Sequence, residues 1–501
     1  MLRNAAVIAI ALIIVLSSCT KRTDLADPLF RKFRNKVFKK LDTVGYNPVF
    51  RKILEHRRLE LNNSDLIANY YQTHGYEPIF ILKFLPQDDL KLIVEHFSKA
   101  SQHGLNPEMF NYSEIKQLVD KFYDKKKIKT LEEAYETMAL LEIKSAEALI
   151  TYSNALQYGI VSPRKIFARY YMKTLRPDNE AMNKVFAIDN MKEFLDTIQP
   201  KNTEYLKLQE ALKSNFVYQG LSSEQTKKAI ALNLERLRWK NKPTTDRYVW
   251  VNIADYSLKY VENGKTNLTM KVCVGKGPEQ EIQDADYDES ENSIRPHNHQ
   301  TPQLNSEIYN AQVNPIWNIP QSIAKNEIYD KVLNDPYYLL NNNIVVYNES
   351  GEIVDSDTII WSEVSKTNIP YKFKQSPGDD NSLGKIKFQF KNGSNVYLHD
   401  TPAQAPFNLT VRAVSHGCVR LEKPIEFANA LFGNGNNFDI VKRELTESEP
   451  TSRDIQVKPK VPVFLDYMTC FVGSNGQIEI RPDVYQLDRI LYNRMKKYLA
   501  L

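Results

Sequence analysis

Residues 247–253 read Arg-Tyr-Val-Trp-Val-Asn-Ile, and here the hydrophobic period of the chain changes from helical to alternating. Apolar side chains at every second position are typical of a strand with one face in a core. Strand-like runs continue downstream, and Asn-Gly, a strong hairpin signal, separates three pairs of them, at residues 263–264, 392–393 and 475–476. The second half is therefore predicted to be a β-rich domain, sandwich-like or barrel-like.

Upstream of this point the pattern is helical. Between about residues 41 and 238, apolar residues recur at helical spacing, as in the stretch 66–71. Several runs end on a glycine followed by an apolar residue, with a proline a few positions later; these glycines are Gly75, Gly104 and Gly159. This order is typical of left-handed helix caps. We therefore expect an α+β multidomain chain, with a helical first half and a β-rich second half.

Composition and charge exclude some classes of function. The 501 residues are 42% hydrophobic and 25% charged, which is enough for large cores, and the formal net charge is +5. The sequence has no stripe of basic residues with interleaved aromatics. This argues against a nucleic-acid partner.

The first residues resemble a targeting segment. Arg3 precedes an apolar stretch, 5–16, that is shorter than the roughly 20 residues of a membrane span. Leu16-Ser17-Ser18-Cys19 then resembles a bacterial lipobox, which implies a lipoprotein signal peptide at 1–18, lipidation of Cys19 and a tether at 19–40. The expected location is the periplasmic side of a membrane, with the outer membrane preferred over the inner. A plain secretory signal or an uncleaved anchor is the alternative.

The chain has four cysteines, too few for a disulfide-built domain. Cys273 and Cys470 lie in strand-like apolar runs and are expected to be core residues. Cys418 differs because it follows His-Gly in a turn, within the run Ser415-His-Gly-Cys-Val-Arg420. A helix expected at 423–432 would place its N-terminus near this thiol and favour the thiolate. Cys418 is therefore the candidate nucleophile.

The run Tyr397-Leu-His-Asp-Thr401 supplies a base for this nucleophile. His399 ends a predicted strand, and a hairpin-like return is expected to bring it beside Cys418. Asp400 or a backbone carbonyl could orient the imidazole. The carbonyl is preferred because adjacent side chains on a strand point to opposite faces. The Gly417 and Cys418 amides could face a developing oxyanion.

The remaining polar residues of the two runs have open roles. His416 is either a second base or a brace for the loop, and Ser415 is expected, with Gly417 and His416, to form the loop of the oxyanion site. Arg420 either binds a substrate carboxylate or ties down the loop. A zinc site made of His399, His416 and Cys418 is disfavoured, because two ligands flanking a glycine are awkward and no CxxC or HExxH motif exists. No metal or other cofactor is expected.

Two long segments interrupt the β-rich half. The first, 279–291, is acidic and free of glycine, and is expected to be a mobile, solubilising loop and not a cation site. The second, about 320–380, contains a helix-like stretch at 322–333. It is interpreted as a lid-like insertion, since a loop this long inside a compact domain is usually functional.

Taken together, the strand, His399-Asp400 and Ser415-His-Gly-Cys418 resemble the L,D-transpeptidases of the YkuD domain family, whose motif pairs an upstream His with Ser/Thr-His-Gly-Cys. Val274-Gly275-Lys276, the run from Asn314 to Pro320 and the helical first half resemble the large, scaffold-bearing branch of that family. The resemblance implies that Cys418 is the nucleophile and His399 the catalytic base, with Tyr397 lining the pocket.

The implied reaction is acyl transfer in peptidoglycan biosynthesis. The thiolate attacks a donor tetrapeptide stem, releases D-Ala and passes the acyl group to the side-chain amine of an acceptor stem. Stem peptides are then the partners, and carbapenem-type β-lactams the covalent inhibitors. Water or another amine as acceptor gives an L,D-carboxypeptidase, an exchange enzyme or a protein-attachment enzyme. A sortase-like transpeptidase and a non-catalytic wall-binding scaffold are the more distant alternatives.

On this interpretation the chain has a helical scaffold domain at 41–243 and a catalytic domain at 244–445, which carries the insertion at 320–380. Strands and a helix at 446–501 are expected to pack on the catalytic domain. The chain departs from the family in two ways. The stretch 206–238 is too short for the small peptidoglycan-binding module that the branch often carries, and Arg420 stands where many members have Asn.

Overall fold

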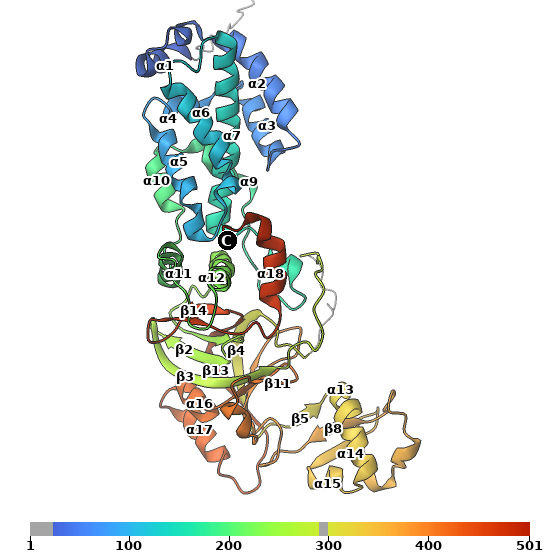
Figure 1. The fold of residues 1–501 in the computed structure, drawn as a ribbon. Coiled ribbons are helices and arrows are strands. Elements are labelled where there is room, and N and C mark those ends of the chain that lie inside the picture. Colours follow the sequence, from blue (N-terminus) through green and yellow to red (C-terminus); the bar gives the residue numbers. More distant parts are fainter. Residues whose placement is uncertain (1–23, 290–298) are drawn as a thin grey trace, which may run out of the picture. The chain divides into compact units, whose positions relative to one another are not determined.

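The structure is a computed structural model that describes residues 24–289 and 299–501 (Figure 1). It divides into two units: residues 24–100, 107–154 and 177–199 form the first, and residues 101–106, 155–176 and 200–501 form the second. Cys19 and the last two residues of the acidic run lie outside the described residues. Within the described ranges, the search for a helix long and apolar enough to cross a bilayer finds none.

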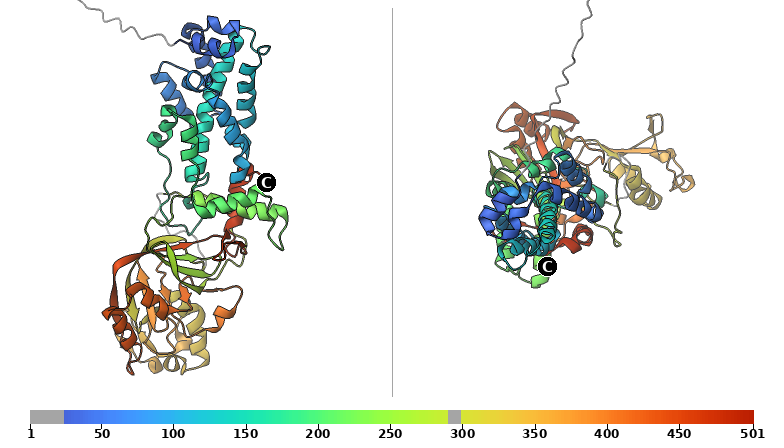
Figure 2. Two further views of the ribbon diagram at one scale, coloured as in Figure 1. Left: turned by 90° about the vertical axis from the view of Figure 1, so that its left-hand side faces the viewer. Right: turned by 90° about the horizontal axis from the view of Figure 1, so that it is seen from above.

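The first unit is helical. The shorter helices surround α7 (Leu131–Tyr158), which runs along the unit and whose residues 141–150 are all buried (Figures 1 and 2). The expected glycine caps are confirmed, since Gly75, Gly104 and Gly159 all have positive φ. The surrounding helices are α1 (Ala26–Phe33), α2 (Thr43–Arg57), α3 (Ser64–Thr73), α4 (Ile79–Phe84), α5 (Asp89–Ser98), α6 (Tyr112–Tyr123), α9 (Asn179–Asn183) and α10 (Met191–Thr197).

The second unit is built on a large sheet whose edges are closed by pairing of β2 with β3, which gives the barrel-like form that the hairpins predicted. In spatial order its strands are β11 (Ala413–Ser415), β3 (Lys265–Gly275), β12 (Val419–Leu421), β10 (Leu398–His399), β9 (Ile386–Phe390), β4 (Leu304–Val313), β13 (Arg453–Asp466), β1 (Tyr248–Asn252) and β2 (Ser257–Glu262). The three Asn-Gly hairpins are confirmed: β2–β3, β9–β10 and a separate pair, β14 (Cys470–Val472) with β15 (Ile478–Ile480).

The C-terminal segment is part of this sheet. β13 lies between β4, with which it is antiparallel, and β1, with which it is parallel. The helices of the second unit are α8 (Pro163–Ile166), α11 (Thr203–Lys213), α12 (Ser223–Arg238), α16 (Pro424–Phe432), α17 (Asn436–Glu444) and α18 (Leu487–Met495). The expected domain borders stay a prediction, and the one at 243/244 falls inside this unit.

The insertion folds as a small subdomain. Its sheet has the order β5 (Trp317–Ile319), β8 (Lys372–Gln375), β6 (Ile344–Tyr347) and β7 (Ile353–Val354). The helix expected at 322–333 is present as α13 (Gln321–Ile323), a π-helical turn (Ala324–Ile328) and α14 (Tyr329–Asn334), followed by α15 (Tyr338–Asn341). These elements have a hydrophobic core of their own, which includes Ile328, Val332, Val346 and Phe373.

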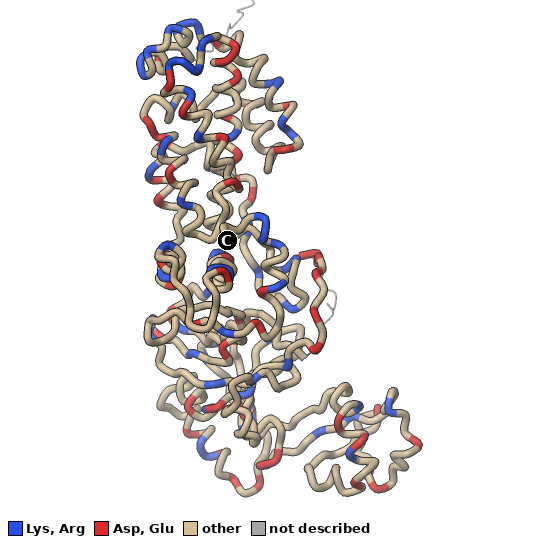
Figure 3. Tube along the Cα trace, in the orientation of Figure 1, with Lys and Arg blue, Asp and Glu red and all other residues tan. Residues whose placement is uncertain are grey.

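The acidic run is held against the second unit over its described part. Arg489 contacts Glu281, Arg494 contacts Asp286 at 2.9 Å, and the Tyr287 amide donates to the Lys165 carbonyl. Basic side chains of α18 thus pair with carboxylates of this run, and the expectation of a mobile loop stays a prediction. Elsewhere in the described chain, Lys and Arg alternate with Asp and Glu over both units (Figure 3).

Candidate active site

The pairing of β10 with β12 brings the two sequence motifs together. Leu398 is opposite Val419 and His399 is opposite Arg420, in parallel register. The Val419 amide donates to the Tyr397 carbonyl at 3.0 Å, which continues the pairing to the start of β12. Alternate strand residues share a face. The side chains of Tyr397, His399, Cys418 and Arg420 therefore lie on one face of the strand pair.

Two expectations drawn from the sequence are wrong. The return from His399 to Cys418 is not a hairpin, because β10 and β12 are parallel and need a crossover, which residues 400–418 supply. The thiol is also not at a helix N-terminus, because β12 intervenes and α16 begins only at Pro424. An extended residue advances the chain by about 3.3 Å, so the backbone moves away from the sulfur before the helix starts.

The imidazole of His399 is oriented by a backbone carbonyl, as expected. Nδ1 lies 2.5 Å from the carbonyl oxygen of Asp400. Because a carbonyl only accepts, Nδ1 carries the proton and Nε2 is the basic nitrogen. The Asp400 carboxylate instead accepts from the Lys385 and Thr401 amides. Burial and the charge of Arg420 lower the pKa of His399 to about 3, so the ring is neutral at pH 7.

The Cys418 thiol is neutral in the resting site. Burial raises its pKa, and this effect exceeds the opposing effects of the Tyr397 hydrogen bonds and of the charges on Lys387 and Arg420. The Tyr397 hydroxyl contacts the sulfur and also accepts from the Trp317 indole of β5. The pair is therefore a neutral thiol with a neutral base, and attack requires the proton to move to His399 as the sulfur reacts.

Residues 415–418, called the nucleophile loop after the candidate nucleophile Cys418, are braced by hydrogen bonds within the loop. The Ser415 hydroxyl donates to the Cys418 carbonyl at 2.6 Å and accepts from the Gly417 amide at 3.2 Å. Of the two amides expected to face an oxyanion, that of Gly417 is therefore already engaged within the loop. Ser415 thus braces the loop, a role that was not predicted for it.

A second layer of hydrogen bonds supports this loop from β3. Thr301 Oγ1 donates to the Gly417 carbonyl and accepts from the Gly275 amide, while the Tyr485 hydroxyl donates to the Gly275 carbonyl at 2.6 Å. A Cβ on Gly275 would lie 1.8 Å from the His299 carbonyl oxygen and 2.9 Å from the Gly417 Cα. Only glycine fits between these backbones, so Gly275 sets the distance between β3 and the loop.

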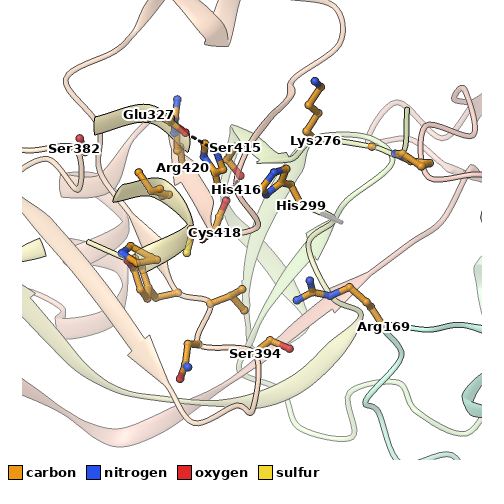
Figure 4. Close-up of a pocket in the computed structure, with 18 of the residues that line it drawn as sticks. Arg169, Lys276, His299, Glu327, Ser382, Ser394, Ser415, His416, Cys418 and Arg420 are labelled. Atoms are coloured by element: carbon orange, nitrogen blue, oxygen red, sulfur yellow. Dashed lines mark hydrogen bonds and ion pairs between the residues drawn. The ribbon is translucent and has the colours of Figure 1, made fainter. Parts of the chain in front are cut away.

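These side chains open into a cavity of about 1000 Å³ (Figure 4). The predicted residues Tyr397, His399, Ser415, His416, Cys418 and Arg420 all line it. The acidic run and the insertion contribute further parts of the wall: residues 279–282 from the first, and Trp317, Pro320, Ser322, Ile323 and Glu327 from the second. Residues at the start of the insertion thus form part of the cavity wall, and the role of the insertion as a lid stays a prediction.

His416 contacts this insertion. Its Nε2 lies 2.7 Å from Glu327 Oε1, and its ring meets that of His299 edge-on at 4.6 Å between centroids (Figure 4). The site loop and the π-helical turn of the insertion are therefore joined directly. This favours the bracing role for His416 over that of a second base.

Two cations of the site were not identifiable from the sequence. Lys387 on β9 is opposite His399, and only 9% of it is exposed. Arg169 lines the cavity from a segment more than two hundred residues before Cys418. Fold topology, not local pattern, brings both to the site.

The described residues contain no group of three or more His, Cys, Asp or Glu side chains placed to hold a metal ion. Cys273 and Cys470 are buried, at the core positions expected for them. Cys418 is the only cysteine of the described chain that lines the cavity.

Residues 246–436 match the model of the YkuD family, the L,D-transpeptidase catalytic domain, and residues 65–212 match that of the Scaffold domain. The chain thus carries a YkuD L,D-transpeptidase catalytic domain, with a Scaffold domain upstream of it. This confirms the resemblance and the fold class inferred from the sequence.

Two individual proteins are similar to the chain. A curated protein of Haemophilus influenzae, described as "Putative L,D-transpeptidase", is 31% identical over 333 residues, which are 65% of this chain and 62% of that protein. The chain thus spans less than two thirds of this relative. A solved chain titled "Structure of the Ldtfm-avibactam carbamoyl enzyme" is 12% identical, with a TM-score of 0.19 over 49% of this chain and 64% of its own. That likeness is too slight to bear on the fold.

Proposed function

We propose that the chain is a peptidoglycan L,D-transpeptidase, with Cys418 as the nucleophile and His399 as the general base. The observation that carries the proposal is the common face of β10 and β12, on which both side chains open into one large cavity. The match of this segment to the family's catalytic model supports the same reaction class. The substrate and the individual steps below are part of the proposal.

In the first half-reaction, the sulfur attacks the carbonyl that precedes the terminal D-Ala of a donor tetrapeptide stem. His399 Nε2 takes the thiol proton as the C–S bond forms, and then gives it to the nitrogen of D-Ala as the C–N bond breaks. The products are free D-Ala and a thioester on Cys418. Arg420, which is next to His399 in the sheet, is the cation available to the carboxylate of the leaving D-Ala.

In the second half-reaction, the side-chain amine of an acceptor stem attacks the thioester. His399 takes a proton from this amine and returns it to the sulfur, which restores the thiol and leaves a new amide crosslink. Water at the same position would give an L,D-carboxypeptidase. In this proposal the insertion favours transfer over hydrolysis by limiting the access of water to the thioester; the support is that its residues form part of the cavity wall.

The test is to incubate the purified protein with a disaccharide-tetrapeptide and to follow the products by mass spectrometry. A crosslinked dimer and free D-Ala are expected from the wild type. Cys418→Ala should yield neither, and His399→Ala should slow acylation by about 10²–10⁴-fold. Cys470→Ala, at a buried cysteine outside the cavity, is the control. Crosslinking by pure Cys418→Ala protein would refute the proposal.

Acylation by a carbapenem gives a second test of the same site. The intact mass should increase by that of the β-lactam in the wild type and not in Cys418→Ala. An unmodified wild type would favour a non-catalytic wall-binding role. Tetrapeptide turned over to tripeptide without dimer would identify water as the acceptor.

We further propose that the protein is a lipoprotein, anchored through Cys19 and facing the periplasm, with the outer membrane as its site. The support for this is the lipobox-like run that ends at Cys19. Cys19→Ser should release the protein from the membrane fraction. Recovery of the variant in that fraction to the same extent as the wild type would contradict the anchor.

A further inference from the structure

Lys387 is a buried cation that the mechanism above does not use. It lies in the middle of β9, opposite His399 on one neighbouring strand and Gln312 on the other. Only 9% of the residue is exposed. Burial lowers the pKa of Lys387, and the carboxylate of Asp454 on β13 opposes this effect only in part. A buried lysine is costly and uncommon, so its position calls for a role.

The ammonium of Lys387 faces the nucleophile's hydroxyl partner. Its Nζ lies 4.9 Å from the centroid of the Tyr397 ring, within the range of a cation–π contact. The hydroxyl of that ring contacts the Cys418 sulfur. Lys387 is also opposite His399 in the sheet, and its charge acts to lower the pKa of both Cys418 and His399.

We propose that Lys387 is a positioning residue of the active site: its ammonium fixes the Tyr397 ring against Cys418 and stabilises negative charge on the sulfur. It acts through the thiol and the phenol and does not itself touch substrate. The inference goes deeper into the proposed function, because it concerns the same nucleophile. Its test, however, needs only the thiol and no transpeptidase activity.

Other groups around the sulfur must be held constant in this test. Tyr397 and His399 face it from β10, Arg420 faces it from β12, and Arg169 acts on it from the segment after α8. The remaining charged or titratable groups of the same cavity are Lys276, Glu279, Glu281, His299, His416 and Glu327. The substitution of Lys387 alone leaves all of these in place.

The experiment measures the rate of Cys418 alkylation by iodoacetamide from pH 5 to pH 10 in the full chain, with intact mass as the readout. In Lys387→Met the midpoint of the rate increase should move up by about one pH unit, because one nearby positive charge is lost. Lys387→Arg should return the midpoint close to that of the wild type. Lys391→Met, at the exposed lysine just after β9, is the matched control and should leave the midpoint unchanged.

Circular dichroism and a thermal melt first establish that each variant is folded. If Lys387→Met does not fold, Lys387→Arg and Lys387→Gln are compared instead. The midpoint of the rate increase should then be higher in Lys387→Gln than in Lys387→Arg. An unchanged midpoint in a folded neutral variant would overturn the proposal, even if crosslinking is lost. Conversely, a shifted midpoint in a protein without crosslinking activity would support this inference and refute the proposed reaction.

Discussion

At the scale of single residues, the protonation states of His399 and Cys418 follow from where they lie. The imidazole is enclosed by β9 and β12, and Lys387 and Arg420 are its neighbours on these strands. Two cations beside a buried ring make the imidazolium unfavourable. The same two cations favour a thiolate, but burial of the sulfur has the larger effect. The resting pair is thus neutral, unlike a preformed thiolate–imidazolium pair.

This arrangement predicts the pH dependence of acylation. The pKa of His399 is lowered to about 3, so the ring keeps its basic form down to about that pH. The second-order rate of acylation by a carbapenem should therefore stay level from about pH 5 to pH 8. Stopped-flow or mass-based acylation rates in a buffer series would measure it. A decrease in rate centred near pH 6.5, the ordinary pKa of histidine, would contradict the assignment.

The residues of the site differ in how far the sequence could identify them. Cys418 and His399 lie in short runs whose residue types carry the chemistry, so both were predictable. Lys387 was not, because the alternation in Lys385–Phe390 gives the period of a strand but not which face of it is covered. Arg169 could not be linked to Cys418 by any local pattern, since only the folded topology makes them neighbours.

At the scale of elements, the contact between His416 and Glu327 joins the nucleophile loop to the insertion. Both side chains are about two-fifths exposed, at 42% and 41%, so the contact contributes about 1 kcal/mol at most. A contribution of about 1 kcal/mol changes the ratio of closed to open positions of the insertion by about fivefold, so that both positions can still be populated.

We therefore predict that Glu327→Gln loosens the insertion. Amide hydrogen exchange over residues 321–334 should become several-fold faster, and the ratio of thioester hydrolysis to amine transfer should rise. Glu363→Gln, at an exposed carboxylate elsewhere in the insertion, is the matched control. Unchanged exchange in Glu327→Gln would mean that the core of the insertion alone holds it in place.

In the helical unit, one buried carboxylate joins three helices. Glu142 of α7 accepts from the Tyr71 hydroxyl of α3 at 2.7 Å and from the Phe80 and Ile81 amides at the start of α4. Burial nevertheless raises the pKa of Glu142 to about 7. Between about pH 4.5 and 7, the folded protein holds a proton that the unfolded chain has released. Stability therefore falls as the pH rises through this window.

The variant that tests this pH dependence is Glu142→Gln, whose side chain does not titrate. The difference in unfolding free energy between wild type and variant should shrink by about 3 kcal/mol from pH 4.5 to pH 7. The variant also leaves one buried amide donor without an acceptor, which costs about 1–3 kcal/mol. Urea unfolding followed by far-UV circular dichroism measures both. Glu136→Gln, at an exposed position of the same helix, should change neither.

The elements themselves were largely predictable, because hairpin turns, helix caps and hydrophobic period are local signals. The glycines at 75, 104 and 159 and the three Asn-Gly hairpins were identified from a few residues each. Strand order was not predictable. The parallel pairs β10–β12 and β1–β13 join segments through crossovers, and nothing local in either strand specifies its partner.

At the scale of the whole molecule, the catalytic sheet does not have a core of its own within the family match at 246–436. The same hydrophobic cluster contains apolar residues from well upstream, namely Val161, Ile166, Phe167, Tyr170, Met172, Ala231, Leu232 and Trp239. Backbone hydrogen bonds also join the upstream segment to the catalytic domain. The Tyr171 amide donates to the Gln303 carbonyl, and the Gln303 amide donates to the Arg169 carbonyl. The cavity wall at Arg169 depends on this segment being in place.

We therefore predict that a fragment of residues 244–501 does not fold stably, although it contains Cys418, His399 and all strands of the large sheet. Loss of a buried aromatic such as Phe167, Tyr170 or Trp239 costs about 3–5 kcal/mol each. Three such losses sum to about 9–15 kcal/mol, which is comparable to the 5–15 kcal/mol that stabilise a typical domain. A fragment of residues 155–501 restores these side chains and should regain a cooperative melt and carbapenem acylation. A cooperative melt of the 244–501 fragment, with acylation at the rate of the full chain, would show instead that the upstream segment is dispensable to both core and site.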